Sequence, residues 1–186
     1  MRLPRNVGKA AAVRVGILDV LEQTDSIVGY WDADLAAPLE ELAGMRQILA
    51  ERPSVHIVTG ARVNLLGRSV RRNLVRHWLG RVFATIASGV LRLPIYDTQC
   101  GAKIFRVQSW TPYVFADPFV TSWVFDVEML ARVVSDPVAS LAGDARSIIC
   151  EYPLAAWHET DGSKLRVHDG VGAAIDLGKI YWRYLR

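Results

Sequence analysis

Short apolar runs that end at polar turns alternate with longer segments of helical periodicity, and this alternation limits the folds open to the chain. Apolar residues recur at helical spacing from Gly8 to Leu21, and the next run, Ser26 to Trp31, stays apolar until it stops at Asp32. Strands that alternate with helices pack as layers, with helices covering a sheet. We therefore predict an α/β fold, formed as a single domain over residues 1–186.

The same pattern predicts the remaining elements. Further helices are expected at 38–51, 68–91, 125–134 and 171–185, and further strands at 55–59 and 147–153. A loop that leads into a short strand is predicted at 97–105, and a polar loop at 157–165. Pro38 favours the start of its helix, and Glu40 and Glu41 suit the positive end of the helix dipole.

The composition indicates which partners and which cellular compartment to expect. The net charge of +3, from 22 basic and 19 acidic side chains, is too even to predict nucleic-acid binding. Two cysteines do not make a disulfide framework, so a reducing compartment is expected. No apolar run reaches the roughly 20 residues that span a bilayer, and the first residues do not resemble a signal peptide. We expect a cytoplasmic protein that is soluble or peripheral on the membrane.

An acidic turn, Asp32-Ala33-Asp34, directly follows the predicted strand at 26–31. In open α/β sheets, ligands bind beyond the carboxyl ends of the strands, which is where this turn is expected. Two carboxylates one residue apart can share a Mg²⁺ or Mn²⁺ ion that keeps coordination positions open for phosphate oxygens. The turn is a candidate metal site, and the alternative of an ordinary solvated turn or helix cap stays open.

Basic side chains crowd the segment after the strand at 55–59: Arg62, Arg68, Arg71, Arg72, Arg76 and Arg81. A helix over 68–91 would place Arg68, Arg72 and Arg76 on one face. Apolar and aromatic residues continue the segment from Trp78 to Leu91. This order is typical of an interfacial helix on anionic lipid and suits a lipid-linked phosphate; the alternative is a solvated basic face above an ordinary core helix.

Five segments carry a resemblance to a known family. They are Arg5–Gly16, Asp32–Glu41, Gly60–Arg62, Asp97–Arg106 and Trp123–Leu130, and a sixth, Gly162–Leu165, is weaker. In this order they resemble the dolichyl-phosphate mannose and glucose synthases, which are family 2 glycosyltransferases. The fourth and fifth segments are closer to the glucosyl than to the mannosyl branch. The resemblance implies a GT-A-type, Rossmann-like mixed sheet flanked by helices.

The resemblance also implies a reaction: metal-dependent, inverting transfer of a hexose from a nucleotide sugar of UDP-glucose or GDP-mannose type to a polyprenyl phosphate at the cytoplasmic face of the membrane. Asp34 would be the main ligand of Mg²⁺ or Mn²⁺, and Asp32 would assist it. Asp34, Asp97 and Gln99 would be catalytic, and Cys100 would line the same cleft. The acceptor phosphate is already ionised at neutral pH, so a strong general base is not obligatory.

Binding roles follow from the resemblance in the same way. The nucleotide sugar would meet Asn6, Lys9, Asp32, Trp123, Asp126, Glu128, Ser163 and Lys164. The acceptor phosphate would meet Arg62, Arg72 and Arg76, with Arg68 and Arg71 as further candidates, and His158 is a weaker candidate for a third metal ligand. Structural alternatives remain, because Asp126 and Glu128 also suit a helix N-terminus and Trp123 also suits a core.

The start of the chain departs from the family, whose members open with a strand, a helix and a second strand that recognise the nucleobase and ribose. Five residues precede Asn6, whereas such a unit takes about 30. We therefore expect that part of the nucleotide-binding half is missing and that activity is weak or absent. Three alternatives stay open: a family 2 enzyme with another acceptor, a non-catalytic remnant that binds a membrane or a partner, and, more distantly, a nucleotidyltransferase.

Overall fold

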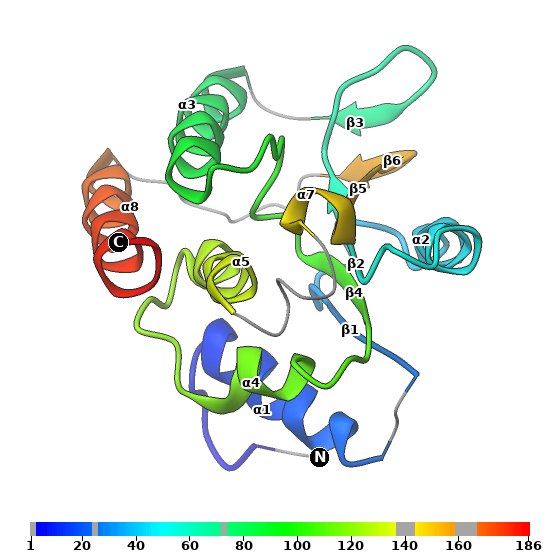
Figure 1. The fold of residues 1–186 in the computed structure, drawn as a ribbon. Helices are drawn as coiled ribbons and strands as arrows, with labels where there is room; N and C mark the ends of the chain where they lie inside the picture. The colour runs from blue at the N-terminus through cyan, green and yellow to red at the C-terminus, as the bar shows by residue number, and fades with distance from the viewer. Residues whose placement is uncertain (1–2, 24–25, 72–73, 137–143, 159–166) are drawn as a thin grey trace.

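The structure, a computed structural model, describes residues 3–23, 26–71, 74–136, 144–158 and 167–186 (Figure 1). For residues 71, 74–77 and 167–169 it describes the backbone alone.

A four-stranded mixed sheet forms the centre of the fold, in the order β1-β4-β2-β5. Its strands are β1 (Ile27–Trp31), β4 (Ala102–Arg106), β2 (Ile57–Ala61) and β5 (Ile149–Pro153). Strand β4 is antiparallel to both of its neighbours, β1 and β2, whereas β2 and β5 are parallel. Two short strands, β3 (Ser69–Arg71) and β6 (Ala156–His158), form a second, parallel pair.

Helices cover both faces of the sheet (Figure 1). One face meets α1 (Lys9–Leu21), α4 (Thr111–Ala116) and α5 (Phe125–Ser135), and the other meets α2 (Glu41–Glu51). Outside α5 lie α3 (Leu74–Leu91), α8 (Val167–Ile180) and a terminal π-helical turn, η1 (Tyr181–Leu185). A short helix, α7 (Ala145–Ile148), leads into β5.

Side chains that alternate along the strands divide the core between the two faces. Ile57 and Phe105 belong to the larger cluster, with residues of α1, α3, α4, α5 and α8. Val58 and Ile104, one position along, belong to the smaller cluster against α2. Successive side chains of a strand point to opposite faces, so the near-continuous apolar runs seen in the sequence are what a sheet buried on both sides requires.

The predicted α/β fold with a mixed sheet flanked by helices is confirmed, and most predicted elements lie within a few residues of their expected bounds. The prediction of a helix from residue 68 is wrong at its start. Residues 69–71 form β3, which pairs with β6, and the described helix begins at Leu74. This pairing depends on residues 156–158, which are distant in sequence, so local helical periodicity did not reveal it.

Two further elements differ from the sequence prediction. The helix α4 was not predicted, although Pro112 stands in its first turn, where proline is favoured. Residues 157 and 158, predicted as the start of a polar loop, belong to the strand β6, and residues 159–166 lie outside the described part. Both elements are short, and short elements carry too few periods for a pattern to be distinctive.

Glu128 joins the loop before α5, the helix α5 itself and η1. Its side chain is wholly buried and accepts hydrogen bonds from the amides of Val120 and Thr121, at 3.1 and 3.0 Å. Arg132 of the next helical turn donates to it at 2.8 Å, and the Tyr184 hydroxyl of η1 at 3.0 Å. Glu128 therefore has a structural role in the core.

Neutralising Glu128 is expected to destabilise the protein. Glu128→Gln leaves the buried Arg132 guanidinium without its counter-charge, and breaking a buried pair in this way costs about 3–5 kcal/mol. Urea unfolding measures the loss. Asp176→Asn, which breaks the more exposed pair between Asp176 and Lys179, is the matched control and is expected to cost about 1 kcal/mol or less. Equal stabilities for the two variants would contradict the structural role.

Candidate functional site

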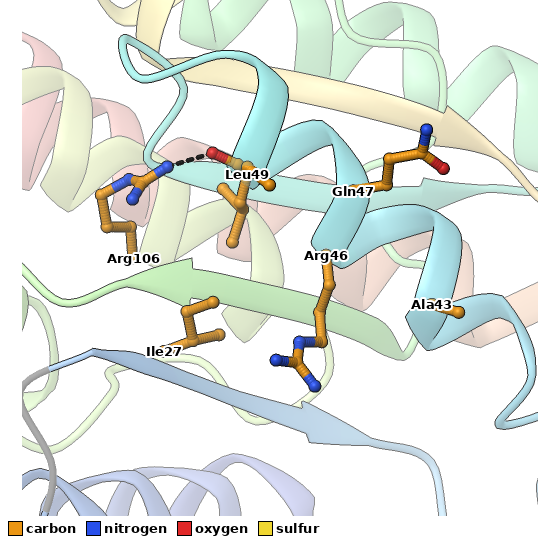
Figure 2. A pocket seen from close by; sticks show the side chains of 7 residues that line it. Ile27, Ala43, Arg46, Gln47, Leu49 and Arg106 are labelled. Carbon is orange, nitrogen blue, oxygen red and sulfur yellow. Dashed lines mark hydrogen bonds between the residues drawn. The ribbon is translucent and has the colours of Figure 1, made fainter.

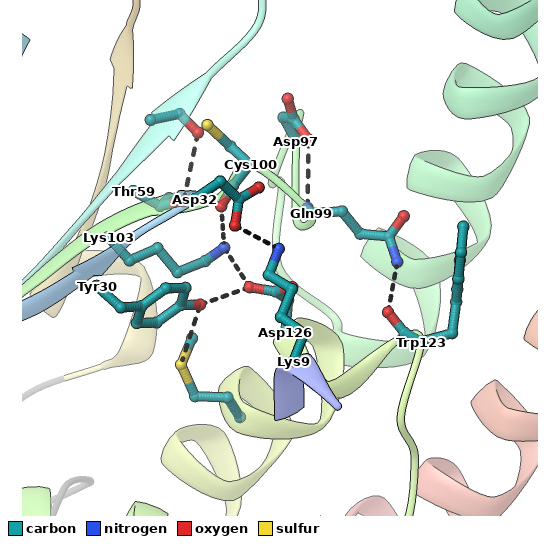
Figure 3. Close-up of polar contacts among 12 residues, drawn as sticks. Lys9, Tyr30, Asp32, Thr59, Asp97, Gln99, Cys100, Lys103, Trp123 and Asp126 are labelled. Carbon is teal, nitrogen blue, oxygen red and sulfur yellow. Dashed lines mark hydrogen bonds and ion pairs between the residues drawn. The ribbon is translucent and has the colours of Figure 1, made fainter. Parts of the chain in front are cut away.

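The direction of β4 brings together several segments that carry polar residues. Strands β1, β2 and β5 end at the same edge of the sheet, and the antiparallel β4 begins there. The turn at 32–34, Arg62 and the loop at 96–101 therefore meet at one edge. Figure 3 shows Lys9 and Asp126, from the N-termini of α1 and α5, beside Asp32. We call this edge the candidate site.

Asp32 is held at the candidate site by contacts with two segments. Its carboxylate lies 2.7 Å from the Lys9 ammonium, in a pair that is about two-fifths exposed, and its backbone amide donates to the Gly101 carbonyl at 2.9 Å. A Cβ atom at Gly101 would lie 1.9 Å from Asp32 Oδ2. The carboxylate thus packs directly against the glycine backbone, which no other residue type would allow.

Asp34 is the more exposed carboxylate of the turn. Its Oδ1 accepts the Ala36 amide at 3.1 Å, and the Asp32 carbonyl accepts the Leu35 amide at 3.0 Å. Leu35 has a φ of 52°, so the chain passes through a left-handed conformation between the two hydrogen bonds. The tight turn sets Asp34 outward from the strand end while Asp32 faces Lys9.

A buried charged group lies beneath the exposed pair (Figure 3). Lys103 and Asp126 are both almost fully buried, and Lys103 Nζ lies 2.6 Å from Asp126 Oδ1 and 2.5 Å from the Cys100 carbonyl. The Tyr30 hydroxyl donates to the same carboxylate oxygen at 2.5 Å. Burial and the Asp126 charge raise the pKa of Tyr30 well above its ordinary value, so the hydroxyl stays a donor. The group fixes α5 and the start of β4 against β1.

Arg62 and Asp97 form the other charged contact of the site. Arg62 Nε and Nη2 donate to the two oxygens of Asp97 at 2.6 and 2.8 Å, and the Arg62 amide adds a third bond at 3.1 Å. Burial disfavours the charged guanidinium, but the Asp97 carboxylate outweighs it and raises the pKa of Arg62. The guanidinium also lies 5.6 Å from the Trp157 ring. This is the bidentate geometry of a strong, directional ion pair.

Gln99, Cys100 and Trp123 belong to the same part of the structure: Gln99 and Cys100 follow Asp97 in its loop, and Trp123 contacts Gln99 (Figure 3). Gln99 donates through its side chain to the Trp123 carbonyl at 3.4 Å, and Trp123 exposes half of its side chain, so it is not a core aromatic. Cys100 is buried, and burial raises its pKa to about 11. A thiol of this kind packs and does not act as a nucleophile.

Divalent-ion binding depends on how many oxygens converge. Within the described residues, no group of three or more His, Cys, Asp or Glu side chains is close enough to hold an ion. His158 contributes its amide to the Ala36 carbonyl at 2.9 Å and is not part of such a group. The carboxylates of Asp32 and Asp34 fit a hard ion in type but supply fewer than the six or so oxygens that it takes. The remaining oxygen ligands would have to come from a diphosphate and water.

Several predicted binding residues lie elsewhere or outside the described part. Ser163, Lys164 and Arg72 lie outside it, and the side chain of Arg76 is not described. Arg68 and Arg71 precede α3, so the prediction that Arg68 belongs to the helical row is wrong. Asn6 accepts the Gly8 amide at 2.9 Å just before α1, where it shapes the entry to that helix.

An open hollow of about 520 Å³ lies on the α2 side of the sheet (Figure 2). Arg106 reaches across it to the Leu49 carbonyl. It is lined by Ile27, Ala43, Arg46, Gln47, Leu49, Ala50 and Arg106. None of the predicted site residues lines this hollow, so it is separate from the candidate site.

Four residues that hold the site together were not predicted from the sequence: Tyr30, Gly101, Lys103 and Glu151. Glu151 accepts the amides of Tyr96 and Asp97, both at 2.8 Å. An acidic residue inside the apolar run 147–153 was the available signal, because a carboxylate in a buried strand needs donors. Gly101 and Lys103 stood inside a recognised segment, but their partners come from β1 and α5 and could not be read from it.

Comparison with known proteins gives relatives along the whole chain. This chain is 30% identical to a dolichyl-phosphate beta-glucosyltransferase of Dictyostelium discoideum over 192 aligned residues. The alignment covers 100% of this chain and 54% of the relative. A protein of the same description from Saccharomyces cerevisiae is 29% identical over 100% of this chain, and 55% of its own length is covered. Another from Trichomonas vaginalis is 31% identical over 95% of this chain, and 51% of its length is covered. No protein-family model matches.

This chain is similar to dolichyl-phosphate glucosyltransferases. The resemblance seen in the sequence segments is confirmed at that level, and these relatives are glycosyltransferases by name. The chain spans about half the length of the curated relatives it matches.

Gly101 is expected to be required for the placement of Asp32. Gly101→Ala puts a methyl group against the Asp32 carboxylate and is expected to destabilise the protein by about 1–3 kcal/mol, as overpacking does. Gly89→Ala in α3 is the control, because nothing lies within 4 Å of its added methyl group and alanine favours helix by about 1 kcal/mol. Thermal and urea unfolding compare the two; a Gly101→Ala protein as stable as wild type would contradict the observed contact.

Proposed function

We propose that the candidate site is part of the active centre of a glycosyltransferase that moves a hexose from a nucleotide sugar to a polyprenyl phosphate. Glucose is the first sugar to test, because the relatives above are glucosyltransferases by name. The mixed sheet flanked by helices is consistent with a GT-A-like fold. Because the chain covers about half of each relative, activity is proposed for the site and has to be measured on this chain.

One observation carries the proposal: an acidic turn and an ion-paired arginine lie at the same sheet edge, in a chain similar to these enzymes throughout. The acidic turn suits the donor, whose diphosphate brings negative charge that a cation must balance. Arg62 suits the acceptor, because a guanidinium recognises phosphate oxygens with fixed geometry. Arg62 Nε and Nη2 donate to Asp97, and a guanidinium carries five N–H donors in all.

On the donor side, Asp34 and Asp32 would hold a Mg²⁺ or Mn²⁺ ion, which when bound supplies positive charge to the leaving diphosphate. Lys9 sits 2.7 Å from Asp32 and can turn toward a donor phosphate, since the pair is exposed. Trp123 offers an exposed aromatic face at the N-terminus of α5, which suits the apolar side of a sugar ring. Lys103 and Asp126 lie beneath and keep this wall rigid.

On the acceptor side, Arg62 would orient the phosphate of the lipid. A non-bridging phosphate oxygen attacks the anomeric carbon, the bond from that carbon to the donor diphosphate breaks, and the nucleoside diphosphate leaves with the bonding electrons. The attack is from the opposite side, so the configuration inverts. The acceptor is an anion at neutral pH, and the chain then has to position it without removing a proton.

The acceptor is a lipid, and the described helices carry exposed apolar residues that suit a membrane surface. Trp78, Leu79, Val82 and Ile86 of α3 are each more than half exposed, as are Val171 and Ile175 of α8 and Trp182 of η1. Arg183 of η1 and Arg186 add positive charge at the end of the chain, whereas Lys179 is paired with Asp176. Apolar and basic residues together bind anionic lipid at the interface. No described helix combines the length and the apolar character needed to cross a bilayer.

Replacement of Asp34 tests the donor side. Asp34→Asn removes a charge where the ion is proposed, and we expect turnover to fall at least about 100-fold with unfolding unchanged. The assay follows nucleoside diphosphate release with UDP-glucose and, separately, GDP-mannose, citronellyl phosphate as acceptor, and Mg²⁺ or Mn²⁺. Glu40→Gln, which neutralises an exposed carboxylate of the same loop, is the control and should keep full activity.

This assay and a titration of the nucleotide sugar with and without Mn²⁺ together separate the competing functions. Donor binding that needs Mn²⁺, with turnover only for a different acceptor, would favour a family 2 enzyme of other specificity. Pyrophosphate release from a nucleoside triphosphate, with a sugar phosphate in place of the lipid phosphate, would favour a nucleotidyltransferase. If the wild-type chain neither binds a donor nor turns it over, catalysis is refuted and a binding role is left.

Substitutions on α3 test the proposed membrane contact. Replacing Trp78, Val82 and Ile86 together by serine removes three exposed apolar side chains, and vesicle binding is expected to weaken at least tenfold. Co-sedimentation with vesicles of phosphatidylcholine and phosphatidylserine measures it. Tyr113→Ser on α4, a similarly exposed position on another helix, is the control and should bind like wild type. Unchanged binding by the triple variant would exclude this face of α3.

A further inference from the structure

The turn at Tyr96 and Asp97, which presents the partner of Arg62, is held from β5. Glu151 accepts the Tyr96 amide through Oε2 and the Asp97 amide through Oε1, both at 2.8 Å. Two bonds from one carboxylate to consecutive amides fix the orientation of the peptide between them. Burial raises the pKa of Glu151, and the two amide bonds act in the opposite direction.

The same turn is held from α3 by Arg81. Its guanidinium lies 3.6 Å from the centre of the Tyr96 ring, and its Nη1 donates to the Tyr96 carbonyl at 2.9 Å. A planar guanidinium can stack on a ring and donate to a carbonyl at once, which an ammonium group cannot do. Arg81 belongs to the same helix as the exposed Trp78, Val82 and Ile86, but its side chain is turned toward the loop and is half-buried.

Arg62 depends on this turn for its position. Three of its hydrogen bonds go to Asp97, whose own amide is bound by Glu151. An arginine side chain has several rotatable bonds, so holding it in one geometry requires contacts that are themselves fixed. The chain of contacts thus runs from α3 through Tyr96 and Asp97 to Arg62 at the end of β2.

We propose that Arg81 is a positioning residue for Arg62: by stacking on Tyr96 it holds the Asp97 carboxylate in place, and so sets the affinity of Arg62 for a phosphate monoester. The inference rests on the proposed function for the identity of the ligand and goes beyond it by assigning a role to a residue remote from the phosphate. It also gives α3, the proposed membrane-contacting helix, a physical connection to the acceptor side of the site.

The first experiment measures binding, so it does not need turnover. In the full chain, the ¹⁵N–¹H signal of the Arg62 side-chain Nε–H is followed during titration with citronellyl phosphate. We expect Arg81→Gln to shift or broaden this signal and to raise the Kd for citronellyl phosphate about tenfold. Tyr96→Phe keeps the ring and should match wild type, whereas Tyr96→Ala should behave like Arg81→Gln. Arg46→Gln, which removes an exposed arginine of α2, controls for the change of charge.

A double-mutant cycle separates positioning from a general loss of stability. Once Arg62 is replaced by glutamine, Arg81→Gln should raise the Kd no further, because the arginine that Arg81 positions is absent. In the turnover assay, Arg81→Gln should raise KM for the acceptor about tenfold, with KM for the donor unchanged. A misfolded variant would affect both substrates and would be seen in thermal unfolding, in which case Tyr96→Ala and Tyr96→Phe supply the comparison.

The results that would overturn the inference are specific. An unchanged Arg62 signal and Kd in Arg81→Gln, or additive effects in the cycle, would show that Arg81 does not position Arg62. Absence of turnover by the wild-type chain would refute the proposed function and leave this test intact, because the Arg62 signal and its response to Arg81→Gln are measured without catalysis.

Discussion

The antiparallel insertion of β4 between β1 and β2 is the constraint on which the candidate site depends. A strand that runs against its neighbours begins where they end, so the loop at 96–101 arrives at the edge already occupied by Asp32 and Arg62. Had β4 been parallel, its preceding loop would lie at the opposite edge. The antiparallel direction of this one strand therefore places the acidic turn, the Arg62–Asp97 pair and the Gly101 contact within one region.

Charge compensation shapes the interior on which this edge rests. Lys103 with Asp126, Arg132 with Glu128, and Arg62 with Asp97 are pairs in which at least one partner is almost fully buried. An unpaired charge in such a place is costly, so each pair fixes the relative position of the elements that carry it. The exposed Lys9–Asp32 pair differs, because water screens it and either member can exchange its partner for a ligand.

Much of the fold could be predicted because its elements are long enough to be periodic. The bounds of α1, β1 and α5 agree with the prediction within a few residues. The start of α3 and the short strands β3 and β6 could not be predicted, since their pairing joins residues almost 90 positions apart. For the site, Asp32, Arg62 and Asp97 were named in advance. The burial of Glu128 could not be predicted, because a carboxylate in the first turn of a helix has the same local sequence whether it faces solvent or the core.

The sequence by itself determined the α/β class, the acidic turn after a buried strand, and the similarity to dolichyl-phosphate glucosyltransferases, because these follow from local periodicity and ordered motifs. The tertiary structure alone decided which of the named residues meet. It joined Lys9 to Asp32 and Arg62 to Asp97, buried Glu128, and placed Arg81 and Glu151 behind the Asp97 turn. The physical reason is that partners in a sheet and across packed helices are set by strand order and direction, which no segment of the chain specifies on its own.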